Sequence, residues 1–123
     1  MIEYRSLRNW KYQLTKDYMI HTGIVVGKDI KTDFIDLTKE GILTVFRGYC
    51  WDGASGGIDT RNFMRGSLVH DCGCQLIEEG LLDKRYRPKF DLLLKDLLLE
   101  EGMSKIRAEW VYRTIKFYVR VKY

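Results

Sequence analysis

Several features that would assign a chain to a special class of protein are missing from this sequence. No uninterrupted apolar run reaches about 18 residues, the minimum for a transmembrane helix, and the N-terminus lacks the basic-then-apolar order of a secretion signal. One proline and three cysteines among 123 residues exclude a proline-rich disordered chain and a disulfide-rich scaffold. We therefore expect a protein without a signal peptide or a transmembrane segment, made in the cytoplasm and folded around an apolar core.

The three cysteines are expected to remain reduced. Cys72 and Cys74 lie two residues apart on an expected helix, so they point to different sides and are badly placed to bond to each other. Together with Cys50 and His70 they supply the atom types of a zinc site, but zinc sites favour a turn with about two to four residues between cysteines. We interpret them as small buried side chains, and the sequence requires no cofactor.

One globular domain covering residues 1–123 is expected, because 46% of the residues are hydrophobic and 31% are charged. The first part is rich in β-branched and aromatic residues, and this composition predicts strands. The expected strands are residues 7–15, 17–22, 33–37 and 42–47, with turns at residues 27–29 and 39–41. An antiparallel meander is the simplest arrangement of these strands.

Helices are expected in the second part. Asp59 or Thr60 can cap a first helix that continues to about residue 79, where Gly80 ends it. Pro88 suits the first turn of a second helix, which stops at Gly102.

Ser104 is placed to cap a third helix, in which apolar side chains recur on one stripe. The stripe consists of Ala108, Val111, Tyr112, Ile115, Tyr118 and Val119. Strands followed by helices predict an α+β fold, an N-terminal antiparallel β-meander packed against about three C-terminal helices. Residues 1–47 would be mainly strands, 48–61 a glycine-rich loop and 62–121 mainly helices.

The glycine-rich loop is the most unusual segment. Four glycines among residues 48–57 allow its backbone to turn sharply and to approach other atoms closely. On the following helix, Gly66 and Gly73 each cost about 1 kcal/mol relative to alanine. Close packing, or access for another group, must therefore offset that cost.

His70 is the main candidate for chemistry. It lies on a helix stripe of apolar and small residues, so its imidazole is expected to point inward. The stripe also contains Phe63, Gly66, Ser67, Cys74 and Ile77. Asp71 is turned from His70 by about 100°, so the two neighbours are not expected to form a dyad. A carboxylate from another segment, Asp52, Asp91 or Asp96, is the expected partner of His70.

Four short segments occur in a recognisable order: Gly48-Tyr49, then Asp52-Gly53-Ala54-Ser55, then Leu68-Val69-His70-Asp71, and finally Asp91 ahead of Gly102. In this order they resemble domain-of-unknown-function family 1353, which is found mainly in tailed phages and prophages. The resemblance extends over most of the chain from about residue 42 onward. It implies a fold and a phage context, and it assigns no biochemical role.

Two positions depart from that family. Gly57 stands where the family usually has proline, and Cys72-Gly73-Cys74 replaces a run that ends in tyrosine. A fold tolerates such changes more easily than an activity does.

A shorter likeness concerns residues 49–53, Tyr-Cys-Trp-Asp-Gly, and residues 69–72, Val-His-Asp-Cys. This layout is similar to secreted phospholipase A2, where a glycine-rich calcium loop precedes a helix with adjacent His and Asp. The likeness implies that His70 activates a water, that Asp71 binds calcium with loop carbonyls, and that a distant aspartate orients His70. Three cysteines do not supply the dense disulfide framework of that family.

Positive charge is concentrated at the C-terminal end. Residues 103–123 contain one acidic residue, Glu109, against six basic ones: Lys105, Arg107, Arg113, Lys116, Arg120 and Lys122. Nucleic acid is one possible partner, through Arg113, Lys116 and Arg120. Aromatic residues that could stack on bases lie nearby: Trp110, Tyr118 and Tyr123. A solvated helix face explains the same charges.

Two functions from different classes fit these observations. The first, which we favour, is a bacteriophage structural or assembly protein of the virion head or tail, in which the His/Asp cluster is structural. Its leucine-rich helix (residues 92–94 and 97–99) and its basic helix would contact other phage structural proteins or further copies of the chain. This function places the protein in the virion or the host cytoplasm.

The second function is a small phage hydrolase. His70 would be the general base, and Asp52, Asp71 or Asp91 would orient it or hold a divalent cation. Ser55 or loop amides would polarise the scissile group. The first function is favoured because the chain offers ample apolar and basic surface without a complete catalytic set.

Overall fold

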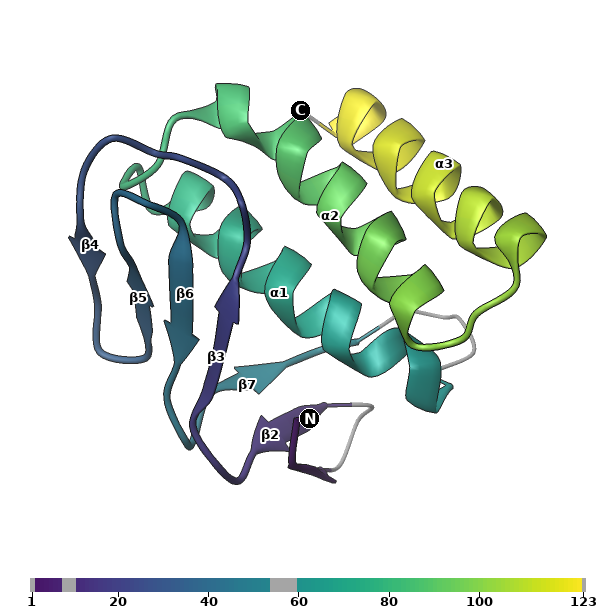
Figure 1. The fold of residues 1–123 in the computed structure, drawn as a ribbon, viewed down its shortest axis with the longest axis horizontal. Helices are drawn as coiled ribbons and strands as arrows, with labels where there is room; N and C mark the ends of the chain where they lie inside the picture. Colours follow the sequence, from purple (N-terminus) through teal and green to yellow (C-terminus); the bar gives the residue numbers. More distant parts are fainter. Residues whose placement is uncertain (1, 8–10, 54–59, 123) are drawn as a thin grey trace.

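The fold is of the α+β class, as the order of the elements predicts. A computed structural model describes residues 2–7, 11–53 and 60–122, without the side chains of residues 118–122. Within these described residues, seven short strands precede three long helices. Figure 1 shows the helices side by side in chain order, with α1 nearest the strands and α3 furthest from them.

The strands form two antiparallel sheets. In the first sheet the order is β1-β2-β7, with β1 at Tyr4–Ser6, β2 at Tyr12–Leu14 and β7 at Cys50–Trp51. In the second sheet the order is β3-β6-β5-β4, with β3 at Tyr18–His21, β4 at Ile30–Lys31, β5 at Ile35–Leu37 and β6 at Ile42–Val45. The expected meander therefore describes only β4, β5 and β6, because β3 pairs with β6 and not with the next strand along the chain.

Three of the four expected strands are present in shorter form, and the first one is different. Residues 7–15 were expected to form one strand, but Lys11 lies outside any strand, β2 covers only three residues, and residues 8–10 lie outside the described part. β1, β4 and β7 were not expected, since two or three residues are too few for an alternating pattern. Both expected turns are confirmed by left-handed glycines, Gly27 with φ of 79° and Gly41 with φ of 97°.

The helices follow their expected boundaries. The helical elements are α1 at Arg61–Glu78, the short 3-10 helix η2 at Lys84–Tyr86, α2 at Arg87–Glu100 and α3 at Lys105–Lys122. Gly80 and Gly102 have positive φ after α1 and α2, Pro88 lies in the first turn of α2, and the Ser104 hydroxyl accepts a bond from the amide of Arg107. Among the described residues, no helix is both long and apolar enough to cross a membrane.

Thr60 is the N-cap residue of α1, but its side chain bonds no helix amide and instead contacts Asn62 Oδ1 at 2.5 Å. Asp59, the other expected cap, lies outside the described residues. η2 was not expected, because a single turn leaves no periodic pattern. Its start is nonetheless chemically defined, since Asp83 accepts a hydrogen bond from the amide of Arg85.

Two clusters of buried side chains make the core. One fills the space between the strands and α1 and reaches Phe90 and Leu97 of α2. The second lies between the three helices and consists of Phe63, Leu94, Leu98, Met103 and Ala108, with Val111 and Ile115 packed against it. Ala108, Val111 and Ile115 of the α3 stripe therefore face the core as expected. Tyr112 is half-buried under Lys95 and Lys116, and the side chains of Tyr118 and Val119 lie outside the description.

Two glycines allow α1 and α2 to come close. A Cβ atom at Gly73 would lie 2.5 Å from Cδ1 of Phe90, and one at Gly66 would lie 2.8 Å from Cδ1 of Leu94. Both distances are too short for real atoms, so only glycine fits without a shift of the neighbours. Close packing is thus what offsets the helix cost of these residues, as the sequence indicated.

We expect Gly73→Ala to lower the free energy of unfolding by about 1–3 kcal/mol, the usual cost of overpacking. The Phe90 ring that the new methyl group would meet is fully buried and cannot move aside. Gly66→Ala is the matched control, because its methyl group meets the flexible end of Leu94 and alanine has the better helix propensity. Urea denaturation of both variants measures the difference, and equal stabilities would contradict this account of the packing.

Candidate functional site

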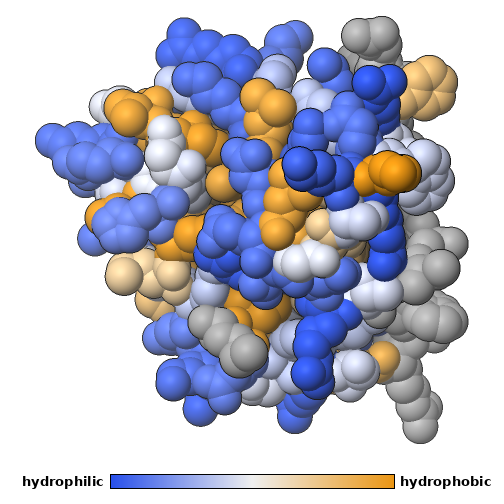
Figure 2. All heavy atoms as spheres, turned by 45° about the vertical axis from the view of Figure 1, so that its right-hand side comes forward, coloured by the Kyte–Doolittle hydropathy of each residue, from blue (hydrophilic) through white to orange (hydrophobic). Residues whose placement is uncertain are grey.

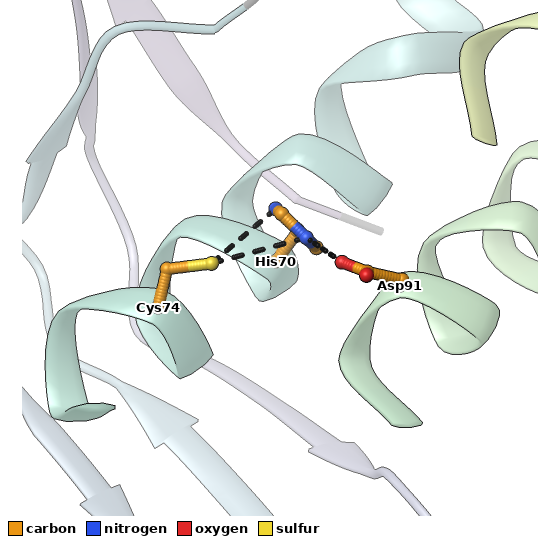
Figure 3. A network of polar contacts seen from close by, with 3 residues as sticks. All are labelled: His70, Cys74 and Asp91. Carbon is orange, nitrogen blue, oxygen red and sulfur yellow. Dashed lines mark hydrogen bonds and ion pairs between the residues drawn. The ribbon is translucent and has the colours of Figure 1, made fainter. Parts of the chain in front are cut away.

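His70 is buried in the contact between α1 and α2, as its stripe predicted. It lies on α1 between Gly66 and Gly73, and its side chain faces α2. The imidazole Nε2 is 2.6 Å from Asp91 Oδ1, and Figure 3 shows Asp91 reaching it from α2. His70 is 7% exposed and Asp91 is 4% exposed. The structure therefore identifies the partner carboxylate as Asp91.

The other carboxylates considered as partners are elsewhere. Asp52 and Asp96 are both exposed, whereas His70 is not. Asp52 is instead close to Asp71, as described below. Of the three candidate partners, only Asp91 bonds to His70, and Asp52 acts on the neighbouring Asp71.

Cys74 adds a contact that the sequence reading did not predict. Its Sγ atom is 3.7 Å from Nδ1 and 3.8 Å from Nε2 of His70, one helical turn further along α1. Nearly equal distances to both nitrogens place the sulfur beside the ring and not in line with either N–H bond. The spacing of four residues between His70 and Cys74 could have revealed this contact, because such residues are neighbours on a helix surface.

The environment of His70 favours its protonated form. Burial alone would lower the pKa of the imidazole, but the hydrogen bond to Asp91, the contact with Cys74 and the negative charge of Asp91 outweigh it and raise the pKa to about 9. At neutral pH the pair is accordingly an imidazolium and a carboxylate within the core. An imidazolium has no lone pair with which to accept a proton.

Asp71 occupies a different environment on the same turn of α1. Burial raises the pKa of its carboxyl group to about 7. The charge of His70 opposes the increase, the charge of Asp52 adds to it, a hydrogen bond from the Asp52 backbone opposes it, and Glu78 adds to it. Asp71 therefore accepts a hydrogen bond from the backbone of Asp52, at the start of the glycine-rich loop, and it is also within the electrostatic influence of His70.

The strand that leads into the glycine-rich loop is fastened to α1. The indole N–H of Trp51 donates to Ser67 Oγ at 3.0 Å, and the Tyr49 hydroxyl donates to Gln75 Oε1 at 2.9 Å. Both aromatic rings are buried. These two aromatic side chains therefore connect the strand to α1 beside the contact between the Asp52 backbone and the Asp71 carboxylate. Ser55, a candidate under the hydrolase hypothesis, lies outside the described residues.

The cysteines and acids give little support to a metal site. All three cysteines are free thiols, as expected, but only Cys72 is fully buried. Cys74 is partly buried, and the interpretation as a buried side chain is wrong for Cys50, which is exposed. Within residues 2–7, 11–53 and 60–122, no group of three or more His, Cys, Asp or Glu side chains is arranged to hold a metal ion.

The His70–Asp91 pair predicts a pH dependence of stability. His70 has an ordinary pKa of 6.5 and a folded pKa of about 9, so it binds its proton more tightly in the folded protein. The resulting stabilisation is complete below pH 6.5 and is lost as pH rises through 9. We expect the free energy of unfolding to decrease by up to about 3 kcal/mol across this window, at about 1.36 kcal/mol per pKa unit.

Urea denaturation at intervals from pH 6 to pH 9.5 measures this decrease. His70→Gln should remove the decrease in the free energy of unfolding above pH 7. Titration of Asp71, whose folded pKa is about 7, affects that free energy at lower pH. His21→Gln is the matched control, because His21 is the other histidine of the chain and is exposed. A wild-type profile that stays flat from pH 7 to pH 9 would contradict the assignment of an imidazolium.

Comparisons with known proteins identify no relative of this chain. A scan against protein-family models finds no match, and searches of curated proteins and of solved structures also find none. The function is therefore inferred from the resemblance stated above and from three features of this chain: the His70–Asp91 pair, the raised pKa of Asp71 and the exposed faces of the helices.

Proposed function

We propose that this chain is a non-enzymatic bacteriophage protein, a structural or assembly component of the virion head or tail. The observation that carries the proposal is the His70–Asp91 contact, in which both side chains are more than nine-tenths buried and bonded to each other at 2.6 Å. Such a sealed pair is a structural element of a helix–helix interface.

A general base needs an unprotonated nitrogen that reaches a substrate or a water. Nε2 of His70 is occupied by Asp91, and the raised pKa of about 9 keeps the ring protonated at neutral pH. Both properties argue against His70 as the base of a hydrolase. They agree with a buried polar network that specifies how two helices fit together.

The phage context of the proposal comes from the resemblance to domain-of-unknown-function family 1353. Two of its segments, the one containing His70 and the one beginning at Asp91, are far apart in the sequence and in contact in the fold. If members of that family share this contact, both positions would recur in them because each side chain needs the other as its buried partner.

A small phage hydrolase is the alternative, and one observation favours it. The pKa of Asp71, raised to about 7 by burial and by nearby acids, falls in the range useful for proton transfer at neutral pH. Asp52 beside it would complete a pair of carboxylates. The hydrolase would then depend on Asp71 more than on His70.

Replacement of the buried pair by apolar residues distinguishes a structural role from a catalytic one. Asp91→Leu alone should cost about 3–5 kcal/mol, because it leaves His70 buried without its partner. His70→Met combined with Asp91→Leu should recover most of that loss, since a packed apolar pair of similar volume is often as stable as an ion pair. Urea denaturation of the two single variants and the double variant measures the recovery.

A second experiment tests function in a phage that depends on this protein. Particles carrying the stable double variant should form and infect, and mass spectrometry of purified particles should find the wild-type protein in a fixed ratio to the known subunits. A folded Asp71→Asn variant that abolishes infection, beside a double variant that infects, would favour the hydrolase. Absence of the protein from purified particles would contradict a virion role.

A further inference from the structure

The outward face of α3 has features that the core does not use. α3 packs chiefly on α2, and its opposite side is open to solvent. On that side Ile106, Trp110 and Phe117 are 86%, 67% and 66% exposed. These are the most exposed large hydrophobic side chains among the described residues.

These three residues and Arg113 form a seam along α3. Their spacing is four, three and four residues, the spacing of the contact positions in paired helices. At about 100° per residue the four side chains fall within about 60° of the helix circumference. A straight seam of this kind fits the side of another helix, whose side chains would enter the gaps between those of α3.

The charge of the outward face of α3 indicates which side chains the second helix must carry. Arg113 lies within the seam and is exposed, and the exposed Lys105 and Lys116 both lie to one side of it, about 80° and 60° away around the helix. Glu109, the acid of this face, is already shared between Arg113, at 2.8 Å, and Lys95 of α2. The face therefore has positive charge that its own residues do not balance, and a partner must offer carboxylates to complement it.

The same charges argue against a second copy of this chain. An isologous pair places the same surface on both sides, so Arg113, Lys105 and Lys116 of one copy would face those of the other. Like charges brought together in an interface cost free energy. An acidic helix of a different protein avoids this repulsion.

Nucleic acid and a membrane surface fit the seam less well. Phosphates would bind Arg113 and Lys116, but the exposed Ile106 would have no role in such a complex. Insertion into a membrane needs a broad apolar face. Figure 2 shows hydrophobic areas on the forward face that are separated by hydrophilic side chains, so no such continuous surface is present among the atoms coloured there.

We infer that the seam of Ile106, Trp110, Arg113 and Phe117 docks an acidic amphipathic helix of another protein, with apolar residues against the seam and carboxylates around Arg113. The inference deepens the proposed function and rests on it, because it names the kind of partner that an assembly component would bind.

The test uses the full chain and a labelled synthetic peptide of about three heptads, with leucine at the a and d positions and glutamate at the flanking positions. Fluorescence anisotropy should show saturable binding that weakens with added salt. Trp110→Ala and Arg113→Glu should each weaken the affinity at least about tenfold. A peptide with lysine in place of glutamate should not bind.

Two variants on the sheet side serve as matched controls. Met19→Ala removes an exposed apolar side chain from β3, and Lys31→Glu reverses an exposed charge on β4. Both should leave the affinity unchanged. All four variants alter exposed residues, and unchanged melting temperatures would confirm that each is folded.

Several results would overturn the inference. They are an acidic peptide that does not bind, equal binding of the lysine peptide, and dimerisation that Trp110→Ala abolishes. Binding to phosphatidylglycerol vesicles or to a single-stranded oligonucleotide, lost in both Trp110→Ala and Arg113→Glu, would assign the seam to a membrane or to nucleic acid. Failure of the proposed function is recognised separately, by absence of the protein from purified particles.

Discussion

The close approach of α1 and α2 is the constraint on which the rest of the structure depends. Gly66 and Gly73 have no side chains to keep the helices apart, and His70 lies between them on the same face of α1. Phe90 fills the space over Gly73, and the next residue, Asp91, reaches the imidazole. One short segment of α2 therefore supplies both the apolar packing and the polar bond.

A buried ion pair is not an efficient source of stability, because two charges must be removed from water. Its effect here is on the alignment of the helices. A displacement of α2 by one turn along α1 would leave both His70 and Asp91 buried without a partner. It would also move Phe90 from Gly73 to a position of α1 that has a side chain. The ion pair and the glycines thus select one alignment and make the alternatives costly. α1 is fastened on its other side as well, through Trp51 and Tyr49 of the strand region.

The sequence predicts those features of the fold that have a local cause. Gly80 and Gly102 end helices through their own backbone conformation, and Ser104 caps α3 through its own hydroxyl. The inward direction of His70 follows from the periodicity of one helix. Sequence alone narrowed its partner to three carboxylates, but the choice of Asp91 depends on how α2 lies on α1, which is a property of packing.

Other features could not be read from the sequence because their causes are non-local. β7 contains two residues and exists because it pairs with β2, far away in the chain. The pairing of β3 with β6, in place of a full meander, also depends on contacts across the sheet. Asp52 was one of the three candidate partners of His70, but in the fold Trp51 is anchored on Ser67 and Asp52 lies close to Asp71.

The buried pair and the exposed seam are connected through α2. α3 owes its orientation chiefly to α2, through Leu94 and Leu98 in the core and the Lys95–Glu109 ion pair at the surface. α2 in turn owes its alignment to Asp91 and Phe90. In a protein that works by binding, an imidazolium without access to substrate still contributes to function. It fixes the helix that holds α3, and so it determines where Trp110 and Arg113 would meet the partner helix that we infer.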